Sequence, residues 1–193
     1  FHFISRSEYR DKESKVFIKN LESRFGKFYL VPEGGTNELA VRGCEEILTE
    51  DDKNQFDFVC CSIGTGGTIS GLINSSKKNQ QIIGFPALKG AFLKQDIRKF
   101  VTKNNWQIIT DYHFGGYAKV TNQLISFINQ FKQETGIPLD PVYTGKMMFG
   151  LVDLIKKDFF SDKSKILIIH TGGLQGIKGM NQRLKQKKLQ LIH

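Results

Sequence analysis

A short apolar segment that runs directly into a glycine-rich loop constrains the fold of this chain more than any other feature. Phe58–Ser62 consists of residues that favour β-strands, and it continues as Ile63-Gly64-Thr65-Gly66-Gly67-Thr68-Ile69-Ser70-Gly71, with a helical pattern from Thr68. Glycines let the backbone approach a ligand closely, and the amide groups at a helix N-terminus attract a phosphate. The segment therefore predicts a strand, a phosphate-binding loop and a helix in succession.

Two familiar phosphate motifs do not match this loop. A Walker loop needs a lysine directly after its last glycine, and the next lysine here is Lys77. A dinucleotide fingerprint needs a third glycine where this chain has Ile69. A tight strand-to-helix turn without a ligand stays open as the alternative.

Composition limits the class of protein. The 193 residues are 39% hydrophobic and include 16 phenylalanines, which is enough for a packed core. We expect no membrane span, because no apolar run approaches the length that a span needs, and no secretory leader is visible. Cys44, Cys60 and Cys61 have no metal-ligand spacing, so we expect no metal site and a reducing, cytoplasmic setting. Cys60 and Cys61 are adjacent on a predicted strand and should point to opposite faces.

The net charge of +9 raises the question of nucleic-acid binding. Much of the excess lies in the C-terminal tail, without interleaved aromatic residues or a known DNA-binding pattern. A solvated basic helix end is the better interpretation, and we expect no nucleic-acid partner. The clustered residues are Lys178, Arg183, Lys185, Lys187 and Lys188.

Strands and helices alternate along the chain. Short apolar strands without a period of two are typical of a mostly parallel sheet with helices on both faces, so we predict this α/β class. The expected strands are Phe1–Ser5, Lys27–Val31, Phe56–Ser62, Gln81–Phe85, Gln107–Thr110 and Lys165–His170. The expected helices are Glu8–Phe25, Glu38–Glu50, Thr68–Lys77, Phe92–Lys103, Lys119–Thr135 and Val142–Lys157, before a helical tail.

Three loops follow the carboxyl ends of predicted strands: Gly64–Thr68, Asp111–Tyr117 and Thr171–Gly173. Ligands of open parallel sheets bind at that edge. We therefore expect these loops to meet at one site.

Four segments together resemble a known family. They are Pro32-Glu-Gly-Gly-Thr-Asn37, Ser62-Ile-Gly-Thr-Gly-Gly-Thr68, Leu139-Asp-Pro-Val-Tyr-Thr-Gly-Lys146 and His170-Thr-Gly-Gly173. In this order they resemble the pyridoxal-phosphate enzymes that include D-cysteine desulfhydrase and 1-aminocyclopropane-1-carboxylate deaminase. The resemblance implies the tryptophan-synthase-β-like fold (fold type II) and pyridoxal 5'-phosphate as cofactor.

The resemblance also implies site residues. Gly64, Thr65, Gly66, Gly67 and Thr68 match the loop that holds the cofactor phosphate. Tyr117 and Tyr143 match the family's two active-site tyrosines, Thr144 matches the partner of the pyridine nitrogen, and Thr171 and Gly172 border the ring. Without the resemblance, Tyr143 would be interpreted as a helix anchor and Tyr117 as a packed loop aromatic. A phenol beside a phosphate or an amine can have its pKa lowered and move protons.

Two motifs of the family are missing: the Schiff-base lysine in Ser-Gly-Asn-Lys, and Gly-Gly-x-x-Ser-Asn-His. Lys146 belongs to a different element and does not replace that lysine. We therefore expect an N-terminally incomplete chain, with 1–30 the remnant of a small N-terminal domain and 31–193 the large cofactor-binding domain. We expect this fragment to be inactive alone.

The residue at Thr144 separates two activities in the resemblance. A carboxylate there keeps the pyridine nitrogen protonated for ring opening of aminocyclopropane carboxylate to 2-oxobutanoate and ammonia. A hydroxyl suffices to expel a thiol, so the prediction is D-cysteine desulfhydrase-type β-elimination to ammonia, a 2-oxo acid and sulfide. The deaminase is the alternative, and a non-catalytic phosphate-binding module is the alternative from another class. A small amino acid is the expected substrate, and the resemblance implies a homodimer.

Overall fold

The computed structural model describes all 193 residues, which form two compact units, Phe1–Pro32 and Glu33–His193. The first unit contains two short helices, α1 (Arg6–Arg10) and α2 (Lys15–Phe25). That this unit is the remnant of a small domain stays a prediction.

The prediction of strands in the first unit is wrong. Neither Phe1–Ser5 nor Lys27–Val31 belongs to a sheet. A strand needs a neighbour to take up its backbone N–H and C=O groups, and this unit offers only helices. Ser5 instead accepts a hydrogen bond from the amide of Glu8 and begins α1. The single helix predicted over Glu8–Phe25 is therefore two helices.

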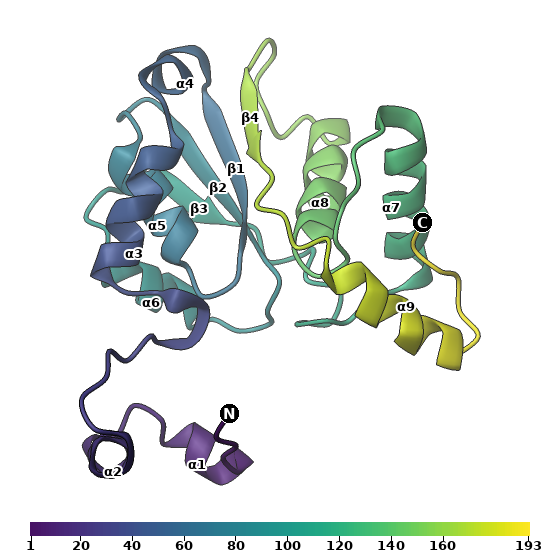
Figure 1. Cartoon of the computed structure of the whole chain (residues 1–193). Coiled ribbons are helices and arrows are strands. Elements are labelled where there is room, and N and C mark those ends of the chain that lie inside the picture. The colour runs from purple at the N-terminus through teal and green to yellow at the C-terminus, as the bar shows by residue number, and fades with distance from the viewer. The chain divides into compact units, whose positions relative to one another are not determined.

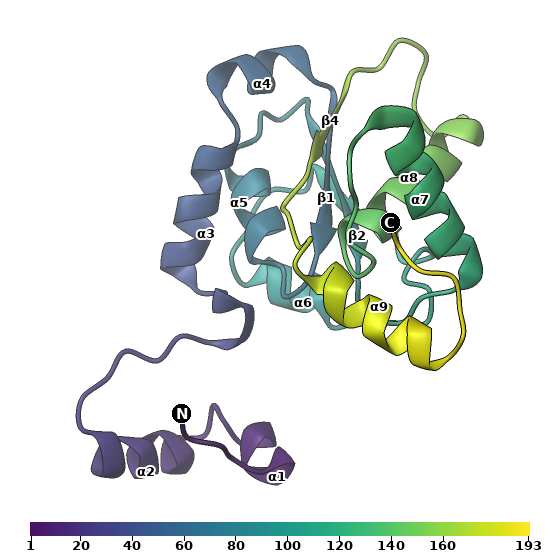
Figure 2. The ribbon, with the colours of Figure 1, turned by 45° about the vertical axis from the view of Figure 1, so that its right-hand side comes forward.

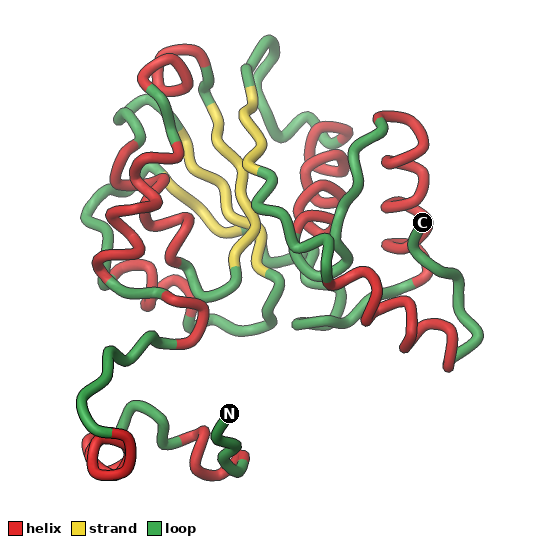
Figure 3. Tube along the Cα trace, viewed as in Figure 1, coloured by secondary structure: helices red, strands yellow, loops and turns green.

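The second unit alternates helices with four strands, as the colours of Figure 3 show along the chain. Its elements, with η for a 3₁₀ helix, are η1 (Glu33–Gly35), α3 (Glu38–Cys44), η2 (Glu45–Ile47), α4 (Glu50–Gln55), β1 (Phe58–Ile63), α5 (Gly67–Ser75), β2 (Gln81–Pro86), α6 (Leu93–Arg98), β3 (Trp106–Ile108), α7 (Asn122–Thr135), α8 (Thr144–Lys156), β4 (Ile166–Ile169) and α9 (Gly176–Gln186).

The four strands form one parallel sheet in the order β3-β2-β1-β4. In the register of β1, Cys60 lies between Ile83 of β2 and Ile168 of β4. Helices α3, α5 and α6 cover one face, and α7 and α8 cover the other (Figures 1 and 2). The predicted parallel α/β sheet with helices on both faces is confirmed.

Each face of the sheet has its own hydrophobic core. Cys60 packs with the residues of α7, α8 and α9, whereas Cys61 packs with those of α5 and α6. The adjacent thiols thus point to opposite faces, as predicted. Burial raises the pKa of Cys60 to about 12, so this thiol is an unreactive core group.

Two predicted helices are shorter than expected. The segment Phe92–Lys103 is helical only as α6, Leu93–Arg98. The segment Glu38–Glu50 is helical only to Cys44 and continues as η2. The stretch Asp51–Gln55, expected to be a loop, belongs to α4. Thr49 and Asp52 form a capping box at its start, which is a local signal for a helix.

We find no helix in this chain that combines the length and the apolar character needed to span a bilayer.

Candidate active site

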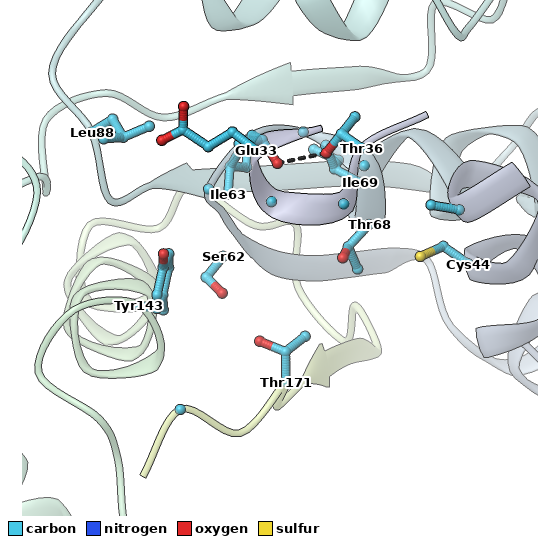
Figure 4. A pocket seen from close by; sticks show the side chains of 18 of the residues that line it. Glu33, Thr36, Cys44, Ser62, Ile63, Thr68, Ile69, Leu88, Tyr143 and Thr171 are labelled. Carbon is cyan, nitrogen blue, oxygen red and sulfur yellow. Dashed lines mark hydrogen bonds between the residues drawn. The ribbon is translucent and has the colours of Figure 1, made fainter. Parts of the chain in front are cut away.

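A cavity of about 720 Å³ lies at the carboxyl ends of β1 and β4. The sheet order reverses here, because β2 and β3 extend from one side of β1 and β4 pairs with the other. Such a switch point is the expected ligand site of an open parallel sheet. Figure 4 shows part of the lining from close by. The lining residues are Glu33, Gly34, Gly35, Thr36, Ala40, Cys44, Ser62, Ile63, Gly64, Thr65, Gly66, Gly67, Thr68, Ile69, Leu88, Tyr117, Tyr143, Thr171, Gly172, Gly173 and Gln175.

The predicted phosphate-binding loop connects β1 to α5 on this cavity. Gly66 precedes α5 with φ of 98°, a conformation that a side chain rarely adopts. No side chain caps this helix, and its first turn contains no acidic residue. The first-turn amides are thus available to an anion, and no carboxylate on the helix start repels it.

A second segment packs against this loop and completes the wall. The hydroxyls of Thr36 and Thr65 are 2.6 Å apart. A Cβ at Gly34 would lie 2.4 Å from the Thr65 hydroxyl, and one at Gly67 would lie 3.0 Å from that of Thr36. The glycines therefore permit the close approach of 33–36 to 64–68. Asn37 caps α3, because its side chain accepts a hydrogen bond from Ala40.

The two predicted tyrosines meet at the cavity. The rings of Tyr117 and Tyr143 form an edge contact, with centroids 6.1 Å apart and planes at 67°. The Tyr143 ring lies over Gly64, where a Cβ would be 3.4 Å from Cε1. Tyr117 comes from the loop after β3, so all three predicted loops contribute to one site.

The surroundings of Tyr143 raise the pKa of its phenol. Burial raises the pKa of Tyr143 to about 12, and Tyr117 and the carboxylate of Asp140 add to the effect. A lowered pKa would need a cation, or hydrogen-bond donors that stabilise the phenolate. The neighbours here are a phenol and a carboxylate. This phenol therefore holds its proton at neutral pH and has a hydrogen available for donation.

Asp140 fixes the backbone at the start of α8. It is 1% exposed, and its Oδ1 accepts the amides of Val142 and Tyr143, each at 2.8 Å. Its Oδ2 accepts the amide and the hydroxyl of Thr144, each at 2.7 Å. These bonds hold Tyr143 toward the cavity at the residue where the helix begins.

Thr144 does not line the cavity, although it was predicted to contact the pyridine nitrogen. It is completely buried, and its hydroxyl also accepts the amide of Asp140 at 2.9 Å. The Thr144 hydroxyl is thus used in the hydrogen bonds with Asp140 at the start of α8. The hydroxyls that do line the cavity on this side are those of Thr171 and Ser62 (Figure 4).

The loop after β4 holds Thr171 in place through its neighbours. The Nε2 of His170 is 3.0 Å from the carbonyl of Pro138, and its Nδ1 accepts the amide of Gly172. A Cβ at Gly173 would lie 3.0 Å from the Asp140 carboxyl carbon. Thr171 and Gly172 thus lie in the wall beside the start of α8.

Several lining residues lacked a signal in the sequence. Cys44, Leu88 and Gln175 come from segments that form no motif and that only the fold brings to the cavity. Ser62 was recognisable, because it lies at the carboxyl end of β1 directly before the loop. No lysine lines the cavity.

The site fits pyridoxal phosphate. A glycine loop with uncapped helix amides suits the phosphate, and the hydroxyls of Ser62 and Thr171 suit a polar ring atom. The cavity volume falls in the range of small-molecule and cofactor sites. Gly64 leaves room for the Tyr143 ring above the loop.

Comparisons with known proteins support the same cofactor. The family described as "Pyridoxal-phosphate dependent enzyme" matches residues 2–172. A mitochondrial protein of Arabidopsis thaliana, the bifunctional D-cysteine desulfhydrase/1-aminocyclopropane-1-carboxylate deaminase, is 32% identical over 200 residues, which cover 91% of this chain and 50% of that protein. The D-cysteine desulfhydrase of Klebsiella pneumoniae strain 342 is 28% identical over 172 residues, which cover 79% of this chain and 52% of that protein.

A solved structure, described as an ACC deaminase homologue, superposes with a TM-score of 0.75 at 28% identity. It covers 96% of this chain, and the match spans 61% of the other chain, which confirms the predicted tryptophan-synthase-β-like fold. The chain spans about half the length of the two relatives above. With a family match that extends over most of its length, the chain belongs to the pyridoxal-phosphate-dependent enzymes.

Proposed function

We propose that the full-length protein is a pyridoxal-phosphate-dependent lyase or deaminase of a small amino acid. The observation that supports this most is the arrangement of the cavity: the uncapped amides of α5 line it, the Tyr143 ring lies over the same loop, and Tyr117 packs against Tyr143. The names of the relatives point to the same class of reaction.

Within the site, each group has a distinct task. The backbone of Gly64–Thr68 binds the phosphate, and the Thr65 and Thr68 hydroxyls add donors. Thr171 and Gly172 would border the ring, and the Thr171 hydroxyl, rather than the buried one of Thr144, would be the partner for its nitrogen. When bound, pyridoxal phosphate withdraws electrons from the α-carbon of the amino acid.

The two tyrosines handle protons and orientation. Tyr143 keeps its proton at neutral pH, so we assign to its Oη the donation of a hydrogen bond to the departing group of the substrate. Tyr117 is 55% exposed and lies at the cavity wall, where it orients the amino acid against Tyr143.

We favour D-cysteine as the substrate, in a β-elimination that yields sulfide, ammonia and pyruvate. The wall beside β4 and α8 presents uncharged hydroxyls from Ser62 and Thr171 and no carboxylate. An uncharged hydrogen-bond partner for the pyridine nitrogen suits loss of a good leaving group such as a thiol better than the opening of a carbon ring. We also propose a homodimer in the cytoplasm, in line with three free cysteines.

The test uses the full-length gene product, purified and supplied with pyridoxal phosphate. We expect an absorption band in the near-visible region and sulfide release from D-cysteine. Formation of 2-oxobutanoate from aminocyclopropane carboxylate without sulfide release would favour the deaminase. A protein that acquires no cofactor absorption and acts on neither compound would refute the proposal.

A Tyr143→Phe variant tests the role of the phenol. Because it keeps the ring and removes only the donor, we expect kcat to fall about tenfold or more while the cofactor spectrum persists. Equal kcat in the two proteins would exclude Tyr143 as the hydrogen-bond donor to the departing group.

A further inference from the structure

A buried lysine next to the site has an unusual set of partners. Lys146 is 1% exposed and lies in the first turn of α8, three residues after Tyr143. Lysines are almost never fully buried without a partner. No carboxylate lies within ion-pair distance of its ammonium group, and its Nζ does not line the cavity.

The ammonium group binds backbone carbonyls instead. Its Nζ donates to the carbonyl of Gly116 at 2.7 Å, to that of His113 at 2.9 Å and, more weakly, to that of Ala87 at 3.4 Å. A lysine has three N–H donors, so these carbonyls match its full capacity. Ala87 directly precedes Leu88 of the cavity wall, and His113 and Gly116 belong to the loop that ends in Tyr117.

Phe114 of that loop packs edge-on against Phe149 of α8, and hydrogen bonds run within the turn, but its backbone conformation is strained. Phe114, Gly115, Gly116 and Ala118 all have positive φ, at 52°, 91°, 112° and 53°. This left-handed backbone conformation is unfavourable for Phe114 and Ala118, because residues with a Cβ rarely adopt positive φ. Such a backbone persists only where its surroundings over-determine it. The hydrogen bonds from Lys146 to the His113 and Gly116 carbonyls add support at both ends of the turn.

We propose that Lys146 is a positioning residue for the active site: its ammonium group draws the His113 and Gly116 carbonyls onto the first turn of α8. Tyr117 is thereby held against Tyr143, which comes from the start of the same helix. The catalytic meaning of this contact rests on the proposed function, whereas the structural role of Lys146 does not.

Lys103 provides a matched control. Its Nζ also donates to two backbone carbonyls, those of Asn74 at 2.7 Å and Ser76 at 2.5 Å. These lie at the end of α5, and neither residue lines the cavity. Lys103→Met therefore removes a comparable set of bonds and leaves the Tyr117 loop untouched.

Backbone hydrogen exchange, followed by mass spectrometry on the 193-residue chain, is the first measurement. In Lys146→Met we expect exchange in peptides covering 113–119 to become about tenfold faster, because the amides of Gly116 and Lys119 bond within this turn. In Lys103→Met the same peptides should exchange as in the wild type. Unchanged exchange of 113–119 in Lys146→Met would overturn the proposal.

A measurement on the wild type covers the case in which Lys146→Met does not fold. In an NMR spectrum of ¹⁵N-labelled lysines, a bonded and buried Lys146 ammonium group should exchange its hydrogens slowly and show contacts to Gly116. An ammonium group that exchanges as fast as those of surface lysines would also overturn the proposal.

Activity of the full-length protein separates positioning from general stability. For Lys146→Met we expect a kcat for sulfide release from D-cysteine about tenfold lower, with the half-saturating pyridoxal-phosphate concentration within about threefold of the wild type. A loss of cofactor affinity with unchanged kcat would contradict the positioning role. If even the wild type releases no sulfide, the proposed function fails, and the exchange measurement still decides the role of Lys146.

Discussion

The start of α8 depends on a single carboxylate, so Asp140→Asn is the most informative substitution in this fold. Oδ1 of Asp140 accepts the amides of Val142 and Tyr143, and Oδ2 accepts both the amide and the hydroxyl of Thr144. An asparagine can keep the first pair with its amide oxygen. Its NH₂ group would face the two donors of Thr144, and neither of those bonds can form.

The size of the effect follows from these contacts. A hydrogen bond to a charged acceptor contributes about 1.5 to 3 kcal/mol, so loss of two of them costs roughly 3 to 6 kcal/mol. Both groups of Thr144 are completely buried, which prevents water from replacing the lost acceptor. For a unit of this size, the loss corresponds to a fall in Tm of about 6 to 24 °C.

Urea unfolding gives the direct measurement. Trp106 is the one tryptophan of the chain and lies buried in β3, so its fluorescence reports on the second unit. Asp96→Asn is the control, because its carboxylate bonds Lys99 at the surface and should contribute less than about 1 kcal/mol. If Asp140→Asn destabilises the chain no more than Asp96→Asn does, the carboxylate does not hold the start of α8.

Three further outcomes test separate parts of the structure. Gly71→Ala should lower the free energy of unfolding by about 1 to 3 kcal/mol, because the new Cβ would lie 2.4 Å from the Cβ of Cys44; unchanged urea unfolding would contradict that close helix contact. The absorbance difference between wild type and Tyr143→Phe should show phenol ionisation near pH 12, since burial raises the pKa of Tyr143 to about 12; a step at pH 10 would show a solvated phenol. Burial lowers the pKa of Lys146 from 10.5 to about 8, so above pH 8 the folded chain binds fewer protons than the unfolded one. Stability should therefore rise by up to about 3 kcal/mol between pH 8 and 10.5 relative to Lys146→Met, as urea unfolding across this range can measure; parallel pH profiles of the two proteins would refute it.

The sheet could be predicted because its strands carry a local signal. β1 and β2 are short apolar runs next to glycine or proline, and both were located within two residues at either end. The predictions for Phe1–Ser5 and Lys27–Val31 used the same kind of signal and were wrong. Apolar composition indicates a segment that can pair, whereas pairing itself depends on a neighbour that the local sequence does not reveal.

The site was predictable in its loops and not in its contacts. Gly64–Thr68 and Thr171–Gly173 follow strands, so the rule for parallel sheets places them together. The contact between Thr36 and Thr65 joins positions 29 residues apart, and no spacing pattern indicates it. Thr144 has the right residue type, but only the structure shows that Asp140 engages its hydroxyl.

The charge states of the site residues were even harder to predict from the sequence than their contacts. The motif identified Tyr143 as a functional residue, yet the direction of its pKa shift depends on burial, on Tyr117 and on Asp140. Asp140 and Lys146 do not line the cavity; Asp140 binds the amides at the start of α8, and Lys146 binds the carbonyls of the Tyr117 loop. Because these two buried charges determine where both phenols lie, substitutions at Asp140 or Lys146 should alter the chemistry of the site without contacting the substrate.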